Sequence, residues 1–185
     1  EFCVDYFTNM TLEGAPAFQE NVTSLEKNWG TKSPNEAIPV DKFSAKAIGN
    51  FDFSKKDYTF DVKADDGIRL WIDGVLHINA WKNQGATAYT TTVAMSAGTH
   101  QVQVDYYENT GNTYLSASWS YARNVKITAA NDATKLNKAR VYAFSGTKYL
   151  GKYSTFNEEG IAEIKDVPFG DVSYRVDYRG QHFTA

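Results

Sequence analysis

Ten residues in the middle of the chain, Asp65 to Gly74, constrain its fold more than any other stretch. From Ile68 to Ile72, apolar and polar side chains alternate, which is the period of a β-strand with one buried face. Asp73-Gly74 follows directly, and Asp-Gly between apolar runs predicts a tight hairpin because glycine accepts a positive φ. The stretch therefore predicts a strand, a turn and a second arm at residues 75–78.

The same alternation returns along the first two thirds of the chain, with turn residues between the segments. Strands are expected at residues 1–7, 41–51, 58–64, 68–72, 75–78, 87–95, 100–107 and 114–119. Residues 15–40 lack a sustained period and contain three prolines, so they predict a long connection with a short strand or helical turn near residues 24–29. Strands at such short spacing predict an all-β fold, an antiparallel sandwich or barrel.

The pattern changes near residue 123. Residues 124–137 contain no aromatic residue and predict a strand entry followed by a linker-like loop. Four short strands are expected after it, at residues 140–144, 149–151, 161–164 and 174–178. We therefore expect two domains, residues 1–122 and a small β-sandwich at residues 125–185. The chain stops shortly after a strand, so we expect a final strand to be missing from this second sandwich.

Charge and cysteine content exclude several classes of protein. Nineteen Lys and Arg against 22 Asp and Glu are interspersed without a basic block, which argues against nucleic acid or an anionic membrane as the partner. There is no apolar run long enough to span a bilayer and no signal-peptide core, so the sequence is typical of a soluble, mature fragment. The lone Cys3 excludes an internal disulfide and is expected to be buried in the first strand.

Asp65 and Asp66 stand at the start of the central strand. Two adjacent carboxylates repel each other unless solvent or a cation neutralises them, and calcium takes several oxygen ligands from flexible loops. The residue types alone leave both a solvated turn and a cation site open.

Residues 2 to about 120 resemble the protective-antigen type (PA-fourteen) of lectin-like domain. No single motif is specific, but many occur in the family's order across the domain. They are Tyr6-Phe7, Leu12-Glu13-Gly14-Ala15-Pro16, Asn28-Trp29-Gly30, Ser33-Pro34, Asp41-Lys42-Phe43-Ser44-Ala45, Tyr58-Thr59-Phe60, the Asp65 to Gly74 stretch, Trp81, Ala97-Gly98-Thr99-His100, Asp105-Tyr106-Tyr107-Glu108 and Trp119.

This resemblance implies a calcium-dependent sugar site. In sugar-binding members, paired aspartates at the position of Asp65-Asp66 share a cis peptide and hold calcium, and vicinal hydroxyls of the sugar complete the coordination. A second loop, matching residues 108–114, supplies further oxygens, for which Asn109 and Asn112 are the candidates. The alternatives are that these two asparagines belong to a solvated hairpin loop and that Glu108 is a structural acid facing a neighbouring strand.

The resemblance also implies an aromatic wall beside the metal ligands. Trp81 is the candidate for stacking on a sugar ring, and a rim aromatic that covers the barrel end is the alternative. Many relatives have an aspartate before this tryptophan, whereas this chain has Asn79 and then Ala80. His77 also occupies a position in the second arm that is usually aliphatic. These departures put the sugar specificity in doubt and leave calcium ligation untouched.

Residues 125–185 loosely resemble the carboxypeptidase-regulatory or prealbumin-like modules of bacterial surface proteins. The motifs are Ala139 to Phe144, Asn157 to Ala162, Val167 to Gly170 and Tyr174 to Tyr178. Such modules are spacers or stalks. A missing last strand would expose a sheet edge, through which neighbouring subunits could pair.

The expected function is therefore an extracellular or cell-surface module that binds a glycan in a calcium-dependent way, as in adhesion. The alternative is a structural surface or filament-forming protein whose lectin-like domain is a scaffold. No Gly-x-Ser-x-Gly elbow, His-Glu-x-x-His or phosphate-binding glycine loop is present, so we expect no enzymatic activity.

Overall fold

The structure is a computed structural model of residues 1–185 and describes residues 1–129, 136–168, 170–178 and 181–184. It divides into two compact units, residues 1–119 (unit 1) and 120–185 (unit 2). The strands are β1 (Phe2–Phe7), β2 (Phe18–Val22), β3 (Leu25–Gly30), β4 (Phe43–Phe53), β5 (Lys56–Asp65), β6 (Gly67–Ile72), β7 (Val75–Ala80), β8 (Thr87–Met95), β9 (Gly98–Glu108), β10 (Thr113–Tyr121), β11 (Arg123–Thr128), β12 (Arg140–Ser145), β13 (Lys148–Thr155), β14 (Ile161–Val167), β15 (Ser173–Tyr178) and β16 (Gln181–Thr184). No α-helix occurs within the described residues, which confirms the predicted all-β class.

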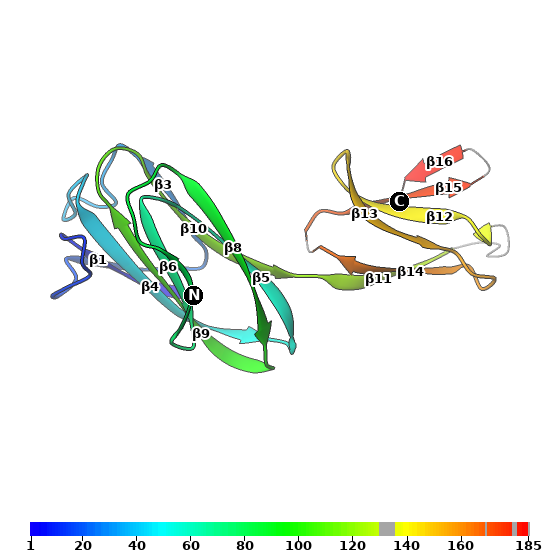
Figure 1. Ribbon diagram of the computed structural model, residues 1–185, viewed down its shortest axis with the longest axis horizontal. Coiled ribbons are helices and arrows are strands. Elements are labelled where there is room, and N and C mark those ends of the chain that lie inside the picture. Colours follow the sequence, from blue (N-terminus) through cyan, green and yellow to red (C-terminus); the bar gives the residue numbers. More distant parts are fainter. Residues whose placement is uncertain (130–135, 169, 179–180, 185) are drawn as a thin grey trace. The chain divides into compact units, whose positions relative to one another are not determined.

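Unit 1 is a sandwich of two antiparallel sheets, ordered β2-β1-β4-β9-β6-β7 and β3-β10-β5-β8 (Figure 1). In each sheet, the first and the last strand in this order pair with a neighbour on one side only. The described strands therefore form an open sandwich and not the barrel that the sequence left possible. The central hairpin is as predicted. Ile72 pairs with Val75, and Asp73 and Gly74 both have positive φ, which a two-residue reversing turn requires.

The alternating pattern explains which faces of the sheets meet. Ile68, Leu70 and Ile72 on β6 are buried in the sandwich, and their neighbours on β9 at positions 102, 104 and 106 are buried with them. Arg69 and Trp71 lie between them and face the opposite side of the sheet. The hydrophobic burial of this one face is what stacks the two sheets.

The segment at residues 15–40 contains two strands, β2 and β3, which pair with β1 and β10. The strand β3 confirms the short strand expected near residues 24–29, whereas β2 was not expected. Cys3 is exposed and not buried, because Phe2 and Val4 take the inward positions of β1 and the alternation turns Cys3 outward.

Unit 2 is a smaller sandwich in which a two-stranded sheet, β11-β14, packs on a four-stranded sheet, β13-β12-β15-β16 (Figure 1). Its core is formed by Ala139, Val141, Ala143, Phe156, Ala162, Ile164 and Val167. The four-stranded sheet ends with β16, which pairs with β15 and was not expected from the sequence. The resemblance of this unit to carboxypeptidase-regulatory modules stays a prediction. Among the described residues, no helix is long and apolar enough to cross a membrane.

Candidate functional site

The candidate site of unit 1 lies where β5 ends and β6 begins. Asp65 is the last residue of β5, Gly67 is the first residue of β6, and the Asp65–Asp66 peptide bond is cis. Gly67 pairs with Tyr107 of β9, so the next residue of that strand, Glu108, lies beside the two aspartates. A Cβ on residue 67 would be 2.0 Å from the Tyr107 ring, so only glycine leaves room for this packing.

Three carboxylates meet at this point. Ligand oxygens of Asp65, Asp66 and Glu108 all lie within 4.8 Å of one another. Glu108 is fully buried and Asp66 is 6% exposed. Among the described residues, no Lys, Arg or His forms an ion pair with any of the three. At an effective dielectric constant of about 20, two such charges repel by roughly 3 kcal/mol, so the arrangement favours a neutralising cation.

Backbone and side-chain donors hold Asp66 in place. Its carboxylate accepts hydrogen bonds from the backbone N–H of Gln84 and of Asn109, each at 2.8 Å. The Gln84 side chain donates to the Asp66 carbonyl oxygen at 2.9 Å. Tyr89 donates to Gln84 Oε1 at 2.5 Å, which fixes the loop between β7 and β8 against the site. Asp66 is therefore oriented before any ligand arrives.

Glu108 is satisfied at only one oxygen. The Tyr106 hydroxyl lies 3.1 Å from Glu108 Oε2 and 2.5 Å from the carbonyl oxygen of Asp65. Glu108 Oε1 is buried without a hydrogen-bond partner in the described structure. A buried carboxylate oxygen normally has a partner, so this atom points to a ligand that completes the site.

The pKa values reflect the same crowding. Burial, followed by the charge of Asp66, raises the pKa of Glu108 to about 7. Burial and then the charge of Asp66 also raise the pKa of Asp65. Burial raises the pKa of the Tyr106 hydroxyl, and the charge of Glu108 adds to the effect, so this group stays protonated and donates. These shifts describe a site in which negative charge is held without compensation from the protein.

The donor set fits a hard divalent cation such as calcium. All three candidate ligands are carboxylates, and calcium takes six to eight oxygens in flexible geometry. Three side chains leave coordination positions for backbone carbonyls, water or ligand hydroxyls. The lone pairs of Asp66 not used by the two N–H donors and the free Oε1 of Glu108 are the atoms available for such an ion.

Asn109 and Asn112, the two asparagines predicted as calcium ligands, have other surroundings than the three carboxylates. The side-chain oxygen of Asn109 accepts from Lys42 Nζ at 3.0 Å, while its backbone N–H binds Asp66. Asn109 therefore supports the site through its backbone, and its amide oxygen is already engaged. Asn112 is exposed in the loop between β9 and β10. The structure thus brings Asp65 and Asp66 together with Glu108.

Trp81 forms an aromatic wall next to the site. It follows β7, and its ring contacts Tyr107 edge-on with centroids 4.7 Å apart. The Arg69 guanidinium lies 3.9 Å from the centroid of the Trp81 ring and is held by Asp105 at 3.0 Å. One face of the tryptophan is therefore covered by a cation. Tyr107 lies near Asp66, because burial and then the charge of Asp66 raise the pKa of the Tyr107 hydroxyl.

Sequence reasoning placed Glu108 at the edge of the site, with a structural role as the alternative. The available signal was its place at the end of an alternating strand, directly after two tyrosines. The sequence alone does not show that Glu108 lies beside Asp65 and Asp66. This proximity follows from the pairing of β6 with β9, which joins residues about forty positions apart.

The chain is similar to a known protein family, to a curated protein and to several solved structures. The family model described as PA14 domain matches residues 3–149. The anti-sigma-I factor RsgI3 of Acetivibrio thermocellus is 30% identical over 118 residues, which are 63% of this chain and 18% of that protein. A solved anti-sigma factor domain-containing protein aligns over 98% of this chain and 96% of its own, with a TM-score of 0.60 and 16% identity. The PA14 domain of the MpAFP antifreeze protein covers 88% and 89%, with a TM-score of 0.56 and 11% identity. These two structural likenesses show a shared fold.

Proposed function

Because this chain belongs to the PA14 domain family, we propose that unit 1 is an extracellular module that binds carbohydrate through a calcium ion. The observation that carries the proposal is the cluster of Asp65, Asp66 and Glu108, with a buried carboxylate oxygen that has no partner among the described residues. The module binds its ligand and catalyses no reaction on it. The three carboxylates are assigned to holding the cation, which leaves none of them to act as an acid or base.

The protein contributes rigidity and charge to this binding. Asp66 is fixed by Gln84 and Asn109, so the free energy of ordering the site is spent during folding and not during ligand binding. When bound, the ion would supply positive charge and open coordination positions that accept vicinal hydroxyls. Neutral sugars offer such hydroxyl pairs at a spacing that one cation bridges.

The wall beside the ion selects the ligand by shape. Trp81 presents an apolar ring surface at the site, and Arg69 keeps this ring in place from one face. The C–H face of a sugar ring packs on such a surface. Asn83, which accepts a hydrogen bond from the Tyr107 hydroxyl at 2.8 Å, adds a polar group on the same loop.

A calcium titration by calorimetry, followed by a glycan array with and without chelator, tests the proposal. We expect calcium binding by the native chain, its loss in Asp66→Asn, and glycan signals that the chelator removes. Asp57→Asn is the matched control, because Asp57 is an exposed aspartate at the far end of β5. Calcium binding without glycan binding would leave a structural ion only, and no calcium binding would overturn the site itself.

A second candidate role is that of a sensing module within a longer regulatory protein. The 30% identity to an anti-sigma-I factor favours a sensing module that passes on the presence of a glycan to a regulator. Replacing the matching segment of that relative with this chain tests the idea. A sigma-dependent reporter is expected to respond to the glycan with the native segment and to lose the response with Asp66→Asn. A reporter that never responds would count against sensing and leave binding untouched.

A further inference from the structure

One face of unit 2 carries a group of aromatic and arginine side chains. Val141 and Ala143 on β12 point into the core with no exposed surface, so Arg140, Tyr142 and Phe144 lie on the outer side of the sheet. On the neighbouring strands, Leu150 and Val176 pack against the core, which turns Tyr149 and Arg175 outward. We call this surface the aromatic–arginine face, formed by Arg140, Tyr142, Phe144, Tyr149, Tyr153 and Arg175.

The rings of this face form a continuous row. Tyr142 contacts Tyr149 and Tyr153 with centroid distances of 5.8 and 5.9 Å, and Phe144 contacts Tyr149 at 5.5 Å. Tyr149 and Tyr153 are 43% and 56% exposed, which is unusual for large aromatic side chains with neighbours to pack on. The row therefore offers ring surface to solvent along two adjacent strands.

Arginines are interleaved with these rings. The guanidinium of Arg175 lies 4.9 Å from the Phe144 centroid and 5.7 Å from that of Tyr142, and Arg140 lies 5.8 Å from Tyr153. Arg175 also pairs with Asp177, whereas Arg140 has no carboxylate partner among the described residues. A guanidinium stacked on a ring keeps its N–H edge free, and that edge matches a carboxylate.

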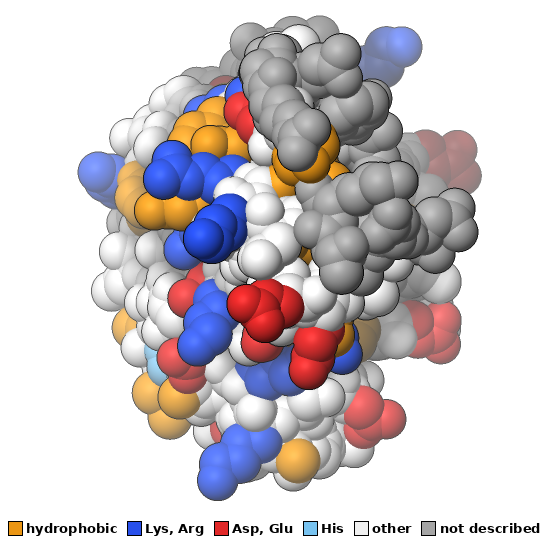
Figure 2. All heavy atoms as spheres, turned by 90° about the vertical axis from the view of Figure 1, so that its right-hand side faces the viewer, with side chains coloured by type: hydrophobic (Ala, Val, Ile, Leu, Met, Phe, Trp, Pro, Cys, Tyr) orange, Lys and Arg blue, Asp and Glu red, His pale blue; other side chains and the backbone are white. Residues whose placement is uncertain are grey.

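Charge is divided unevenly between the two units. Residues 120–185 contain ten Lys and Arg against seven Asp and Glu, whereas residues 1–119 contain nine against fifteen. Figure 2 shows hydrophobic side chains next to Lys and Arg side chains, with Asp and Glu side chains on the same face. An anionic ligand is therefore attracted to unit 2 and repelled by unit 1.

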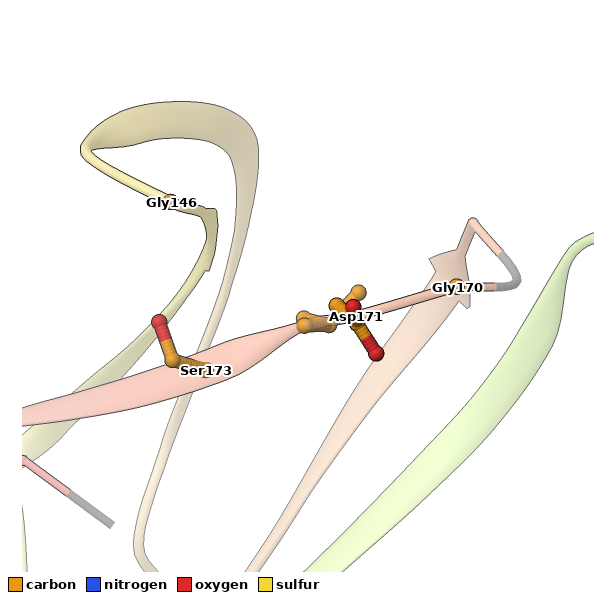
Figure 3. Close-up of a pocket in the computed structure, with 5 residues that line it drawn as sticks. Gly146, Gly170, Asp171 and Ser173 are labelled. Atoms are coloured by element: carbon orange, nitrogen blue, oxygen red, sulfur yellow. The ribbon is translucent and has the colours of Figure 1, made fainter.

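The face ends at a hollow with polar groups. Phe144 and Arg175 line a cavity of about 290 Å³ together with Thr147 and Ser173. A neighbouring hollow of about 390 Å³ is lined by Ser173, Asp171, Val172 and the glycines at positions 146 and 170. Figure 3 shows Ser173 at the start of β15 and Asp171 just before it, near the turn that carries Gly146. Hydroxyls at the end of an aromatic row provide hydrogen bonds for a ligand that extends beyond the rings.

We propose that the aromatic–arginine face of unit 2 binds an extended polysaccharide that carries carboxylate groups, and that it does so without a metal ion. The rings stack on sugar faces, Arg140 pairs with the carboxylates, and the hollow accepts the end of the bound segment. This site is independent of the carboxylate cluster in unit 1, because it uses different residues and the opposite charge.

Binding to a polyuronate in the presence of chelator tests the proposal, with the full chain and calorimetry or affinity electrophoresis as readout. We expect binding that weakens as salt rises, and at least tenfold weaker binding by the Tyr149→Ala/Tyr153→Ala double variant. Arg140→Gln is expected to weaken binding severalfold. Lys165→Gln, which removes a charge from an exposed position on β14 in the other layer, is the matched control and is expected to bind like the native chain.

The carboxyl-reduced form of the same polysaccharide separates stacking from charge recognition. Equal affinity for the reduced form, or no binding in chelator, would overturn the proposal. Undiminished binding by the double tyrosine variant would also overturn it. If the native chain is a dimer by light scattering and the double variant is a monomer, the face is an interface between copies. Asp66→Asn is expected to keep chelator-resistant binding, so failure of the calcium site in unit 1 and failure of this face are told apart.

Discussion

Replacing Glu108 by glutamine should make the metal-free protein more stable and the calcium-bound protein less so. The substitution keeps the shape of the side chain and its oxygen for the Tyr106 hydroxyl. It removes one of three negative charges whose oxygens lie within 4.8 Å. The new amide group can also donate to the neighbouring aspartates, which a carboxylate cannot do.

The pKa of Glu108 gives the size of the effect and its dependence on pH. The pKa rises from 4.5 to about 7, mainly through burial and next through the charge of Asp66. The folded state therefore binds this proton more tightly than the unfolded state, and the stability of the metal-free native chain falls as pH rises from about 4.5 to 7. The full penalty, at most about 3 kcal/mol, is present above pH 7. Glu108→Gln should remove this pH dependence.

Urea denaturation followed by tryptophan fluorescence measures the effect in unit 1 alone. All four tryptophans, at positions 29, 71, 81 and 119, belong to residues 1–119. With chelator at pH 8, the variant should be about 1–3 kcal/mol more stable than the native chain, and the two should converge near pH 5. With calcium the order should reverse, because the variant has lost a charged ligand. A variant that is less stable in chelator at pH 8 would refute the reasoning.

Three further results are expected. Gly67→Ala should destabilise unit 1 by about 1–3 kcal/mol in urea, since the new Cβ would lie 2.0 Å from the Tyr107 ring; unchanged stability would contradict this packing. Leu70→Ala should cost about 2–5 kcal/mol in the same assay, because Leu70 is fully buried, and a smaller loss would place it outside the core. NMR titration should find the His100 pKa above its usual value, because its imidazole hydrogen-bonds Asp73 at 2.6 Å. The contact between His100 and Asp73 then weakens as pH rises through that pKa, and Asp73→Asn should lower the pKa of His100.

Much of the fold follows from local patterns in the sequence. The alternation from Ile68 to Ile72 and the Asp73-Gly74 turn define a hairpin by themselves, since strand period and turn conformation depend on neighbouring residues. The segment at residues 15–40 was harder. A short strand or helical turn was predicted where β3 lies, but the prolines and short apolar runs hide β2. Those two strands are held by pairing with β1 and β10, and such pairing has no local signal.

The candidate site divides in the same way. The sequence by itself determined that two adjacent carboxylates stand at a strand end, where a cation or solvent must balance them. Only the tertiary structure decided that Glu108 completes the cluster and that the Asn109 side chain is taken by Lys42. It also decided that Arg69 covers one face of Trp81. The physical reason is strand register: hydrogen bonding between β6 and β9 sets which ends meet, and residues forty positions apart become neighbours only once the sheet has formed.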